Sequence, residues 1–452
     1  MPPRTTPVER ALDALRLLSV GDVAARDHVR TVRSTLAVAN DGEVLRFLRL
    51  LDTFDVDPAR LERDLAHVGA ASGTIERRVA LARLRRDLEP PRDRILAHLA
   101  APPSDLQFVV DLRAALLTAL EKRPDAADLA PLDEDLRVFL ASRVDLGLLQ
   151  LRRLTWSDSA ALLERLARSE AVHAVRGWFD LKDRLDEDRR VYAFFHAALP
   201  SRPVVFTEVA LTDELPATIR GILNPDAPRV DASQARTATF YSISNTERGL
   251  SGIPFGNALI KQAVEELRKE LPRLRTFATL SPLPGFAGWV RELGERVDPS
   301  VRDAVTTSGW HRKPVAATIR EPLLRLAARY LLAAKRGNGA PLDAVERFHL
   351  GNGATVERLD WLADTTARGI EQSFGIMVNY RYGLDRYASN QLAYAASQSI
   401  DASSPVRALA AADPTVLDEP VAVVSRRHAL RAAIASFVAR AKRLVAGAPA
   451  GA

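Results

Sequence analysis

The sequence predicts an α plus α/β protein, in which a helical bundle is followed by a part that mixes strands and helices. Apolar residues recur every three or four positions up to about residue 145. Beyond it, short runs rich in β-branched residues alternate with turns and helices. Because 452 residues exceed one ordinary core, we expect two domains, 1–145 and 146–452.

Apolar stripes at helical spacing mark the helices of the first domain. The stripes are Val8, Leu12, Leu15 and Leu18; then Ile75, Val79, Ala82, Leu84 and Leu88; then Val109, Leu112, Leu116 and Leu120. Ser104 and Gln107 have the spacing of a capping box that opens the third helix. Prolines separate the helical segments at Pro90, Pro91, Pro102, Pro103, Pro124 and Pro131. This domain contains no chemical motif, and support or oligomerisation is its expected role.

The second domain begins with helical segments at 161–170 and around Trp178 and Phe179. Strands are expected at 203–211, 237–244 and 275–280, with a helix over 257–271 between the last two. The stretch 322–334 is again helical. A strand, a loop, a helix and another strand form an α/β or α+β unit.

Composition narrows the class of protein. The chain has a net charge of +6 and a pI of about 9.7, but its arginines alternate with acidic residues, as on solvated helix faces. We therefore expect no nucleic-acid partner, because interleaved basic and aromatic residues are also missing. No stretch is apolar enough for a membrane span, no secretory signal is recognisable, and cysteine is absent. A cytoplasmic location is the expectation.

A glycine-containing segment, 248–267, lies between an expected strand and an expected helix. Gly249, Gly252 and Gly256 would let backbone amides approach an anion where the helix begins. The spacing matches neither the Rossmann fingerprint nor the Walker motif. Taken alone, the segment is more typical of an ordinary turn between a strand and a helix than of a phosphate site.

Two further segments offer polar side chains. Ser281 ends a strand and precedes Pro282 and Pro284, which would present its hydroxyl rigidly, although no nucleophile elbow surrounds it. His349 precedes a glycine-rich turn, which predicts an imidazole at the edge of a loop. Asp364 and the run from Asn379 to Tyr382 add hydrogen-bonding groups without a distinct signal. No spacing of histidines or carboxylates indicates a metal site.

In combination these segments resemble a known family. The strings FYSISNTERGLSGIPFGNALIK, TFATLSPLPGFAGWV and FHLGNGATVERLDWLADTTARGI, followed by GIMVNYRY, closely resemble signature segments of malonyl-CoA decarboxylases, in the family's order. The resemblance covers roughly 150–395 and implies a helical domain used in assembly, followed by a GNAT-like catalytic domain with a central mixed sheet. It implies that malonyl-CoA is bound by Ser251, Gly252, Ile253, Pro254, Phe255, Gly256 and Asn257, together with the catalytic Ser281 and His349. Pro254 stands where some relatives have an acidic residue.

The resemblance implies conversion of malonyl-CoA to acetyl-CoA and CO2 without a metal or cofactor, in fatty acid metabolism, by a homo-oligomer (dimer or tetramer). On this reading Ser281 is the proton acceptor and His349 the proton donor at C2, and we assign no role to Asn379, Tyr380 or Tyr382. An acyl-CoA-dependent acyltransferase of the GNAT type and a non-catalytic CoA-binding adaptor stay open as alternatives. A serine hydrolase that uses Ser281, His349 and Asp364 is a third.

Overall fold

The computed structural model describes residues 7–20, 24–101, 106–144, 146–227, 229–253 and 255–411. The described residues divide into two compact units. Unit 1 consists of Met1–Val209 and Ser242–Pro272, and unit 2 of Ala210–Tyr241 and Arg273–Ala452. The fold predicted from the sequence, a helical region followed by a mixed sheet with helices, is confirmed. None of the described helices is both long and apolar enough to cross a membrane.

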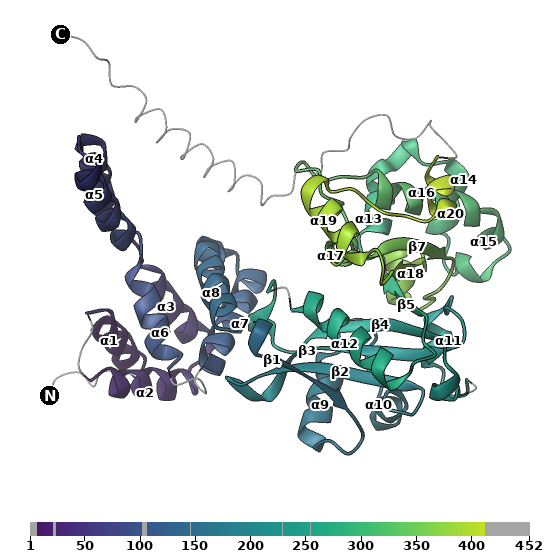
Figure 1. Cartoon of the computed structure of the whole chain (residues 1–452), viewed down its shortest axis with the longest axis horizontal. Coiled ribbons are helices and arrows are strands. Elements are labelled where there is room, and N and C mark those ends of the chain that lie inside the picture. The colour runs from purple at the N-terminus through teal and green to yellow at the C-terminus, as the bar shows by residue number, and fades with distance from the viewer. Residues whose placement is uncertain are drawn as a thin grey trace, which may run out of the picture. The chain divides into compact units, whose positions relative to one another are not determined.

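Unit 1 begins with helices (Figure 1), and leucines are frequent among their buried residues. The helices are α1 (Pro7–Val20), α2 (Ala25–Leu36), α3 (Asp41–Asp52), α4 (Pro58–Ala70), α5 (Thr74–Asp87), α6 (Pro91–Leu99), α7 (Leu106–Lys122) and α8 (Ala130–Arg143), with the 3-10 helix η2 (Pro124–Leu129) between the last two. Asn40 and Glu43 form a capping box at the start of α3, and Asp57 caps α4. Pro91 and Pro131 stand in the first turns of α6 and α8, where the missing amide costs no hydrogen bond. The predicted capping box at Ser104 lies outside the described residues.

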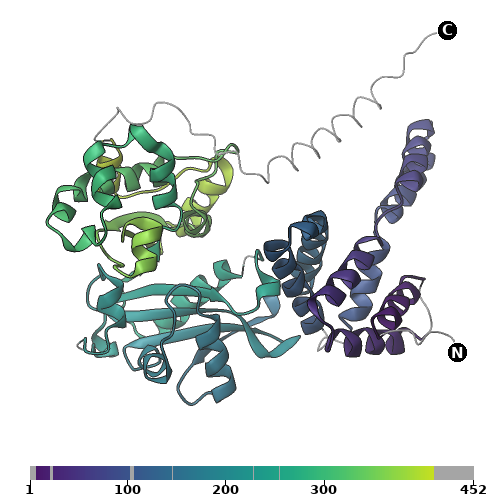
Figure 2. The same ribbon diagram turned by 180° about the vertical axis from the view of Figure 1, so that it is seen from behind.

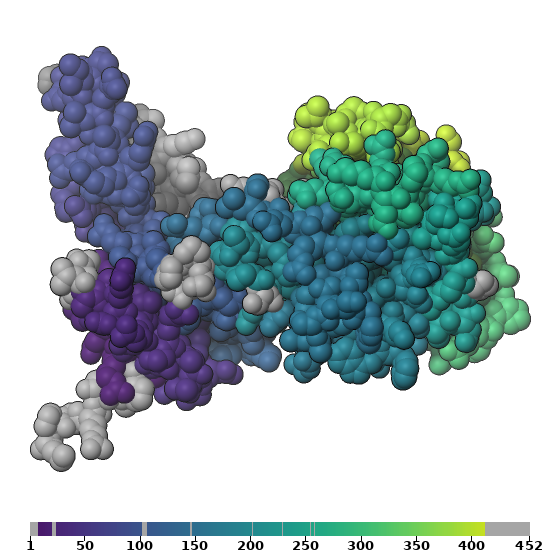
Figure 3. Space-filling model, turned by 60° about the horizontal axis from the view of Figure 1, so that its bottom comes forward, coloured from purple at the N-terminus to yellow at the C-terminus, as the bar shows by residue number. Residues whose placement is uncertain are grey.

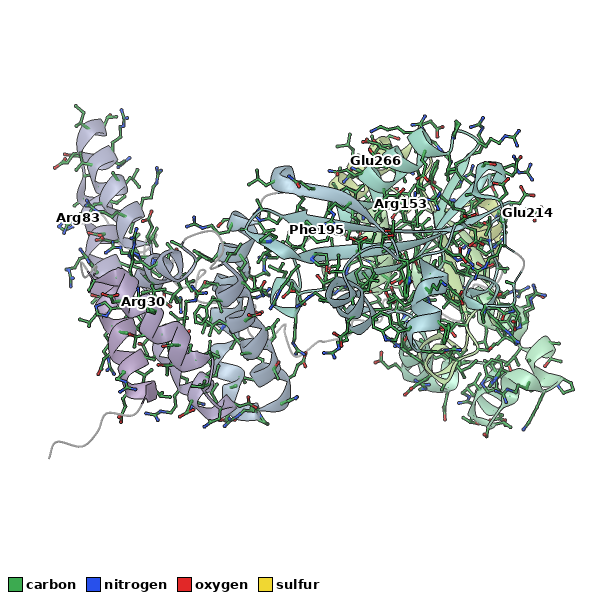
Figure 4. The ribbon with its side chains drawn as sticks, turned by 90° about the horizontal axis from the view of Figure 1, so that it is seen from below. Arg30, Arg83, Arg153, Phe195, Glu214 and Glu266 are labelled. Carbon is green, nitrogen blue, oxygen red and sulfur yellow. The ribbon has the colours of Figure 1, made fainter. Side chains whose placement is uncertain are left out.

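The helix that the sequence predicted around Ile75 and Val79 is present as α5. The apolar residues of α5 do not face a core, because Ile75 is 80% exposed and Val79 65% exposed. Arginines stand on several sides of this helix, so its apolar residues do not form a protected stripe. α5 packs instead beside α4, where Arg83 (labelled in Figure 4) lies 3.0 Å from the buried carboxylate of Asp64. In the view of Figure 3 this hairpin, drawn in blue, lies at the surface.

The sheet part of unit 1 has the strand order β1-β2-β3-β4. The strands are β1 (Leu149–Leu154), β2 (Arg189–His196), β3 (Leu199–Thr212) and β4 (Thr237–Asn245), of which β3 and β4 continue into unit 2. β1 and β2 are antiparallel, with Leu149 opposite His196. The sequence predicted β3 and β4 but not β1 and β2, which both contain adjacent arginines and lack a clear alternation of apolar and polar residues.

Helices cover both faces of this sheet (Figure 1, Figure 2). On one face, α9 (Ala160–Ser169) and α10 (Trp178–Arg184) pack on a core that includes Phe195 and Phe206. On the other lies α12 (Gly256–Glu270), whose Glu270 pairs with Arg153 of β1 at 3.0 Å. Arg153 and Phe195, both labelled in Figure 4, thus project to opposite faces, as the two-residue period of strands requires.

In unit 2 the strand order is β3-β4-β5-β8, and β6 and β7 both pair with β8. The added strands are β5 (Thr276–Thr279), β6 (Ser281–Pro282), β7 (Thr355–Asp360) and β8 (Met377–Arg381). β5 runs parallel to β4, with Thr237 opposite Thr276, and the pairs formed by β8 are antiparallel. The sequence predicted β5 but not β7 or β8.

The helices of unit 2 include α16, which the sequence predicted over 322–334. They are α11 (Ile219–Leu223), α13 (Phe286–Leu293), α14 (Pro299–Thr306), α15 (Val315–Thr318), α16 (Arg320–Leu332), α17 (Ala344–Gly351), α18 (Ala367–Ser373), α19 (Tyr387–Ser397) and α20 (Ser404–Ala411). Further 3-10 turns are η3 (Leu146–Leu148) and η5 (Arg248–Leu250) in unit 1, and η4 (Ala232–Gln234), η6 (Gly294–Arg296) and η7 (Trp310–Arg312) in unit 2. A core cluster around Tyr241, Leu280 and Met377 packs α11 against the sheet.

Candidate active site

Ser281 occupies the position that the sequence predicted, at the end of a strand. β5 ends at Thr279, and Ser281 and Pro282 form the two-residue strand β6, in which Ser281 pairs with Val378 of β8. The strand pairing and the following proline both restrict the backbone here. Ser281 is only 6% exposed, so its hydroxyl group is held in a protected environment.

His349 lies in the last turn of α17, and the expectation that it stands at the edge of a loop is wrong. Asp343 caps this helix by accepting hydrogen bonds from the amides of Val345 (2.8 Å) and Glu346 (3.1 Å). The glycines that suggested a loop instead terminate the helix: Gly353 has a φ of +79°, and a side chain there would overlap the backbone of Tyr387. A helix fixes the direction of the imidazole more firmly than a loop would.

The structure brings Ser281 and His349 together, although 68 positions separate them in the sequence. The distance from Ser281 Oγ to His349 Nε2 is 3.0 Å, and Ser281 Oγ also donates to Thr279 Oγ1 at 2.8 Å. With its proton directed to Thr279, the serine hydroxyl accepts from the imidazole. His349 Nε2 therefore carries a proton and donates it towards Ser281.

Tyr382 holds the other imidazole nitrogen, with its phenol oxygen 2.8 Å from His349 Nδ1. Burial lowers the pKa of His349 to about 3, so its ring is neutral at pH 7. Burial also raises the pKa of Tyr382, which keeps the phenol protonated. Tyr382 thus donates to Nδ1, which agrees with a proton on Nε2. The pKa of His349 lies well below the ordinary imidazole value near 6.5.

β8 supplies the groups to which the sequence gave no role. The ring of Tyr380 is stacked on the imidazole of His349 at 4.5 Å between centroids. Asn379 Nδ2 donates to the carbonyl oxygen of Thr279 at 2.8 Å, and the amide of Tyr380 donates to Thr279 Oγ1 at 3.2 Å. The signal that could have found the two tyrosines is their spacing of two, which places both on one face of an extended segment.

Asp364 does not complete a serine–histidine–carboxylate triad. Its carboxylate accepts from the amide of Thr366 at 2.9 Å, whereas the group on His349 Nδ1 is the phenol of Tyr382. A neutral phenol cannot stabilise an imidazolium ion as a carboxylate does. The arrangement therefore speaks against the hydrolase alternative. Within the described ranges, no group of three histidine, aspartate or glutamate side chains is placed to hold a metal ion.

The predicted malonyl-CoA loop, 251–257, belongs to unit 1, between η5 and α12. Gly252 has a φ of +80°, which glycine tolerates best, and it is exposed. The side chains of Ile253 and Phe255 are buried and anchor the loop, and α12 starts at Gly256 without a side-chain cap. Its first amides therefore have no capping side chain, as at helix ends that bind anions. Pro254 and the side chain of Asn257 lie outside what the structure describes.

Comparison with protein families gives two matches on this chain. The model of the malonyl-CoA decarboxylase C-terminal domain matches residues 147–420, and the model of the N-terminal domain of the same family matches residues 54–143.

Similar proteins carry the same name. Mitochondrial malonyl-CoA decarboxylase of Anser anser anser is 37% identical over 354 residues, which is 72% of this chain and 70% of that protein. The mitochondrial enzyme of Rattus norvegicus is 34% identical over 73% of each chain. The crystal structure of malonyl-CoA decarboxylase from Rhodopseudomonas palustris has a TM-score of 0.80 at 39% identity, covering 88% of this chain and 99% of that one. The structure from Agrobacterium vitis has a TM-score of 0.80 at 35% identity, with the same coverage.

Proposed function

The chain belongs to the malonyl-CoA decarboxylase family, and we propose that Ser281 and His349 remove CO2 from malonyl-CoA to leave acetyl-CoA. The observation that carries this proposal is the contact of 3.0 Å between the serine hydroxyl and the imidazole, both buried. Both members of this buried pair carry a proton on oxygen or nitrogen. Each can therefore donate a hydrogen bond or a proton to the same small acyl group.

The reaction needs an electron sink and a proton. When the bond between C2 and the carboxylate of malonyl-CoA breaks, its electron pair moves into the thioester carbonyl, and CO2 leaves as a neutral molecule. The thioester enolate that forms carries its charge on oxygen. Hydrogen-bond donors fixed in advance around that oxygen lower the barrier, because water would have to reorient to do the same. In this proposal the Ser281 hydroxyl is such a donor, turning from Thr279 to the substrate, and not the proton acceptor that the resemblance implied.

His349 delivers the proton to C2 in this mechanism. Its ring is neutral and bears hydrogen on Nε2, as the hydrogen bonds to Ser281 and Tyr382 indicate. A neutral imidazole can act as an electrophile in a buried site. As Nε2 releases its proton to the enolate carbon, Nδ1 takes the phenol proton of Tyr382, so no imidazole anion forms. Tyr382 regains a proton from water, and the balance is one proton consumed for each CO2 released.

The experiment is to incubate the purified protein with malonyl-CoA alone and identify the products by mass spectrometry. We expect acetyl-CoA and CO2 in equal amounts and, in D2O, acetyl-CoA with one deuterium on its methyl group. Ser281→Ala should abolish most of the turnover, whereas Ser397→Ala, at an exposed serine of α19, should keep it. Free CoA as the product would indicate a hydrolase, and a need for an amine acceptor would indicate the acyltransferase alternative.

We also propose that residues 1–145 form a domain for support and assembly and that residues 146–452 form the catalytic domain. We further propose that the protein is a homo-oligomer, lies in the cytoplasm and acts in fatty acid metabolism. The names of the animal relatives include the word mitochondrial, so location needs its own test by cell fractionation. Light scattering on the purified protein distinguishes a monomer from the expected dimer or tetramer.

A further inference from the structure

One face of α7 contacts the segment that leads into the predicted malonyl-CoA loop. Gln107, Val110 and Arg113 follow one another at intervals of three and therefore share a face of the helix. Gln107 Nε2 donates to the carboxylate of Glu247 at 3.1 Å. Gly249 passes so close to α7 that any side chain there would overlap the carbonyl oxygen of Val110. All these residues belong to unit 1.

Arg113 makes the contacts closest to the loop. Its Nη1 donates to the carbonyl oxygens of Gly249 (2.7 Å) and Ser251 (2.8 Å), and its Nε donates to Asp133 of α8 at 2.8 Å. Arg113 is 2% exposed. A buried guanidinium is tolerated here because the Asp133 carboxylate offsets its charge and its Nε and Nη1 groups are hydrogen-bonded.

These contacts determine which way the loop amides face. In a trans peptide the carbonyl of one residue and the amide of the next point in opposite directions. With the Ser251 carbonyl directed at Arg113, the Gly252 amide points away from α7. Among the described residues that amide donates no backbone hydrogen bond, and Gly252 is exposed. It is thus free to meet an anion, together with the first amides of α12.

We propose that Arg113 is a positioning residue for substrate: it holds the loop so that its amides face the diphosphate of malonyl-CoA. This inference rests on the proposed function, namely that residues 251–257 bind malonyl-CoA. The helical domain thereby contributes to substrate affinity, in addition to any role in support or assembly. Arg113 touches the loop backbone rather than the reacting atoms, so its loss should affect KM and not kcat.

The test compares two substrates that differ only in the nucleotide. Malonyl-CoA carries the diphosphate, and malonyl-pantetheine has the same thioester without it. For Arg113→Met we expect KM for malonyl-CoA to rise roughly tenfold, the effect of losing charge-assisted hydrogen bonds, with kcat within about twofold and KM for malonyl-pantetheine unchanged. The ratio of the two KM values does not depend on the active fraction of the protein.

Two further variants sharpen the test. Arg113→Lys keeps the charge but not the planar guanidinium, so a smaller rise in the same ratio is expected, and this variant carries the test if Arg113→Met does not fold. Arg123→Met is the matched control, because Arg123 pairs with Asp125 and is 41% exposed. It should leave both KM values unchanged.

The outcomes separate this inference from the proposed function. The positioning role would be overturned if Arg113→Met kept the wild-type ratio of KM for malonyl-CoA to KM for malonyl-pantetheine. Equal rises in both KM values leave that ratio unchanged and would overturn the positioning role as well. Gly252→Val, which strains the loop at its positive φ, should also raise KM for malonyl-CoA. If Gly252→Val raises it and Arg113→Met does not, the loop binds CoA without help from Arg113. If neither changes it while decarboxylation persists, the CoA loop itself is misassigned.

Discussion

The phenol ring of Tyr380 is stacked on the imidazole of His349, with centroids 4.5 Å apart and planes inclined by 26°. The imidazole is therefore held by a ring on one face and by hydroxyl groups at both nitrogens, those of Ser281 and Tyr382. Rotation of the His349 side chain would break both hydrogen bonds and the stacking on Tyr380. Such fixation favours a single tautomer, and four expectations about activity and stability follow from it.

The first prediction concerns the pH dependence of kcat/KM. Burial lowers the pKa of His349 to about 3, so the free enzyme keeps a neutral imidazole throughout the range from about pH 5 to 8. We expect no decline of kcat/KM on the acid side of this range, measured as initial rates of acetyl-CoA formation. An acid limb centred between pH 6 and 7 would instead show that His349 titrates normally and would contradict the neutral donor.

The second prediction concerns how the free energy of unfolding depends on pH. The sign of this dependence follows from the lowered pKa of His349. In the unfolded chain His349 binds a proton below its usual pKa of about 6.5, whereas the folded protein does not bind it until about pH 3. Stability should fall as pH decreases through this window, because only the unfolded state gains the proton. Between pH 7 and 4.5 we expect wild type to lose about 2 kcal/mol more than His349→Gln in urea unfolding. Equal losses in the two proteins would refute the lowered pKa.

The third prediction tests the phenol behind the imidazole. Tyr382→Phe removes the hydrogen bond to His349 Nδ1 but keeps the ring, so the fold should persist while the tautomer is no longer fixed. We expect kcat to fall by roughly a hundredfold, in the range of a lost acid–base group, with little change in KM. A Tyr394→Phe variant serves as the control, because the side chain of Tyr394 lies in α19 and is only partly buried. Wild-type turnover in Tyr382→Phe would show that proton transfer from Tyr382 to His349 is not part of the mechanism.

The fourth prediction separates chemistry from binding. His349→Ala should lower kcat by about two to four orders of magnitude, while calorimetry still detects malonyl-CoA binding, because the predicted loop is intact. His67→Ala is the control, since the side chain of His67 is 61% exposed. Unchanged turnover in the His349 variant would exclude this residue as the proton donor.

Local features set Ser281 and His349 apart in the sequence, but their catalytic roles were implied by the resemblance to malonyl-CoA decarboxylases. Proline neighbours singled out Ser281, and glycine neighbours singled out His349, although those glycines end a helix rather than form a loop. The site partners could not be found in this way. Tyr382 lies 33 positions after His349 and reaches it only through the pairing of β8 with β6 and β7.

Long-range contacts explain the other differences as well. Arg113 looks like one more arginine of a helical face, and only folding brings it to Ser251, 138 positions away. In α5 the apolar residues have helical spacing, but none of them is buried. Periodicity predicts that a helix forms, whereas burial of its apolar side depends on the arrangement of other elements.

The last prediction uses the close approach of the loop segment to α7. Gly249→Ala would push a methyl group into the carbonyl oxygen of Val110. Because this oxygen belongs to the backbone of α7, a side-chain rotation cannot remove the overlap, and the segment around residue 249 has to move. We expect a loss of about 1–3 kcal/mol in unfolding free energy and a rise in KM for malonyl-CoA. Gly288→Ala in α13 is the matched control: nothing lies within 4 Å of its added methyl group, and alanine favours helix by roughly 0.5–1 kcal/mol. Equal effects of the two substitutions would mean that the loop segment is not pressed against α7, and the argument for Arg113 would lose its geometric basis.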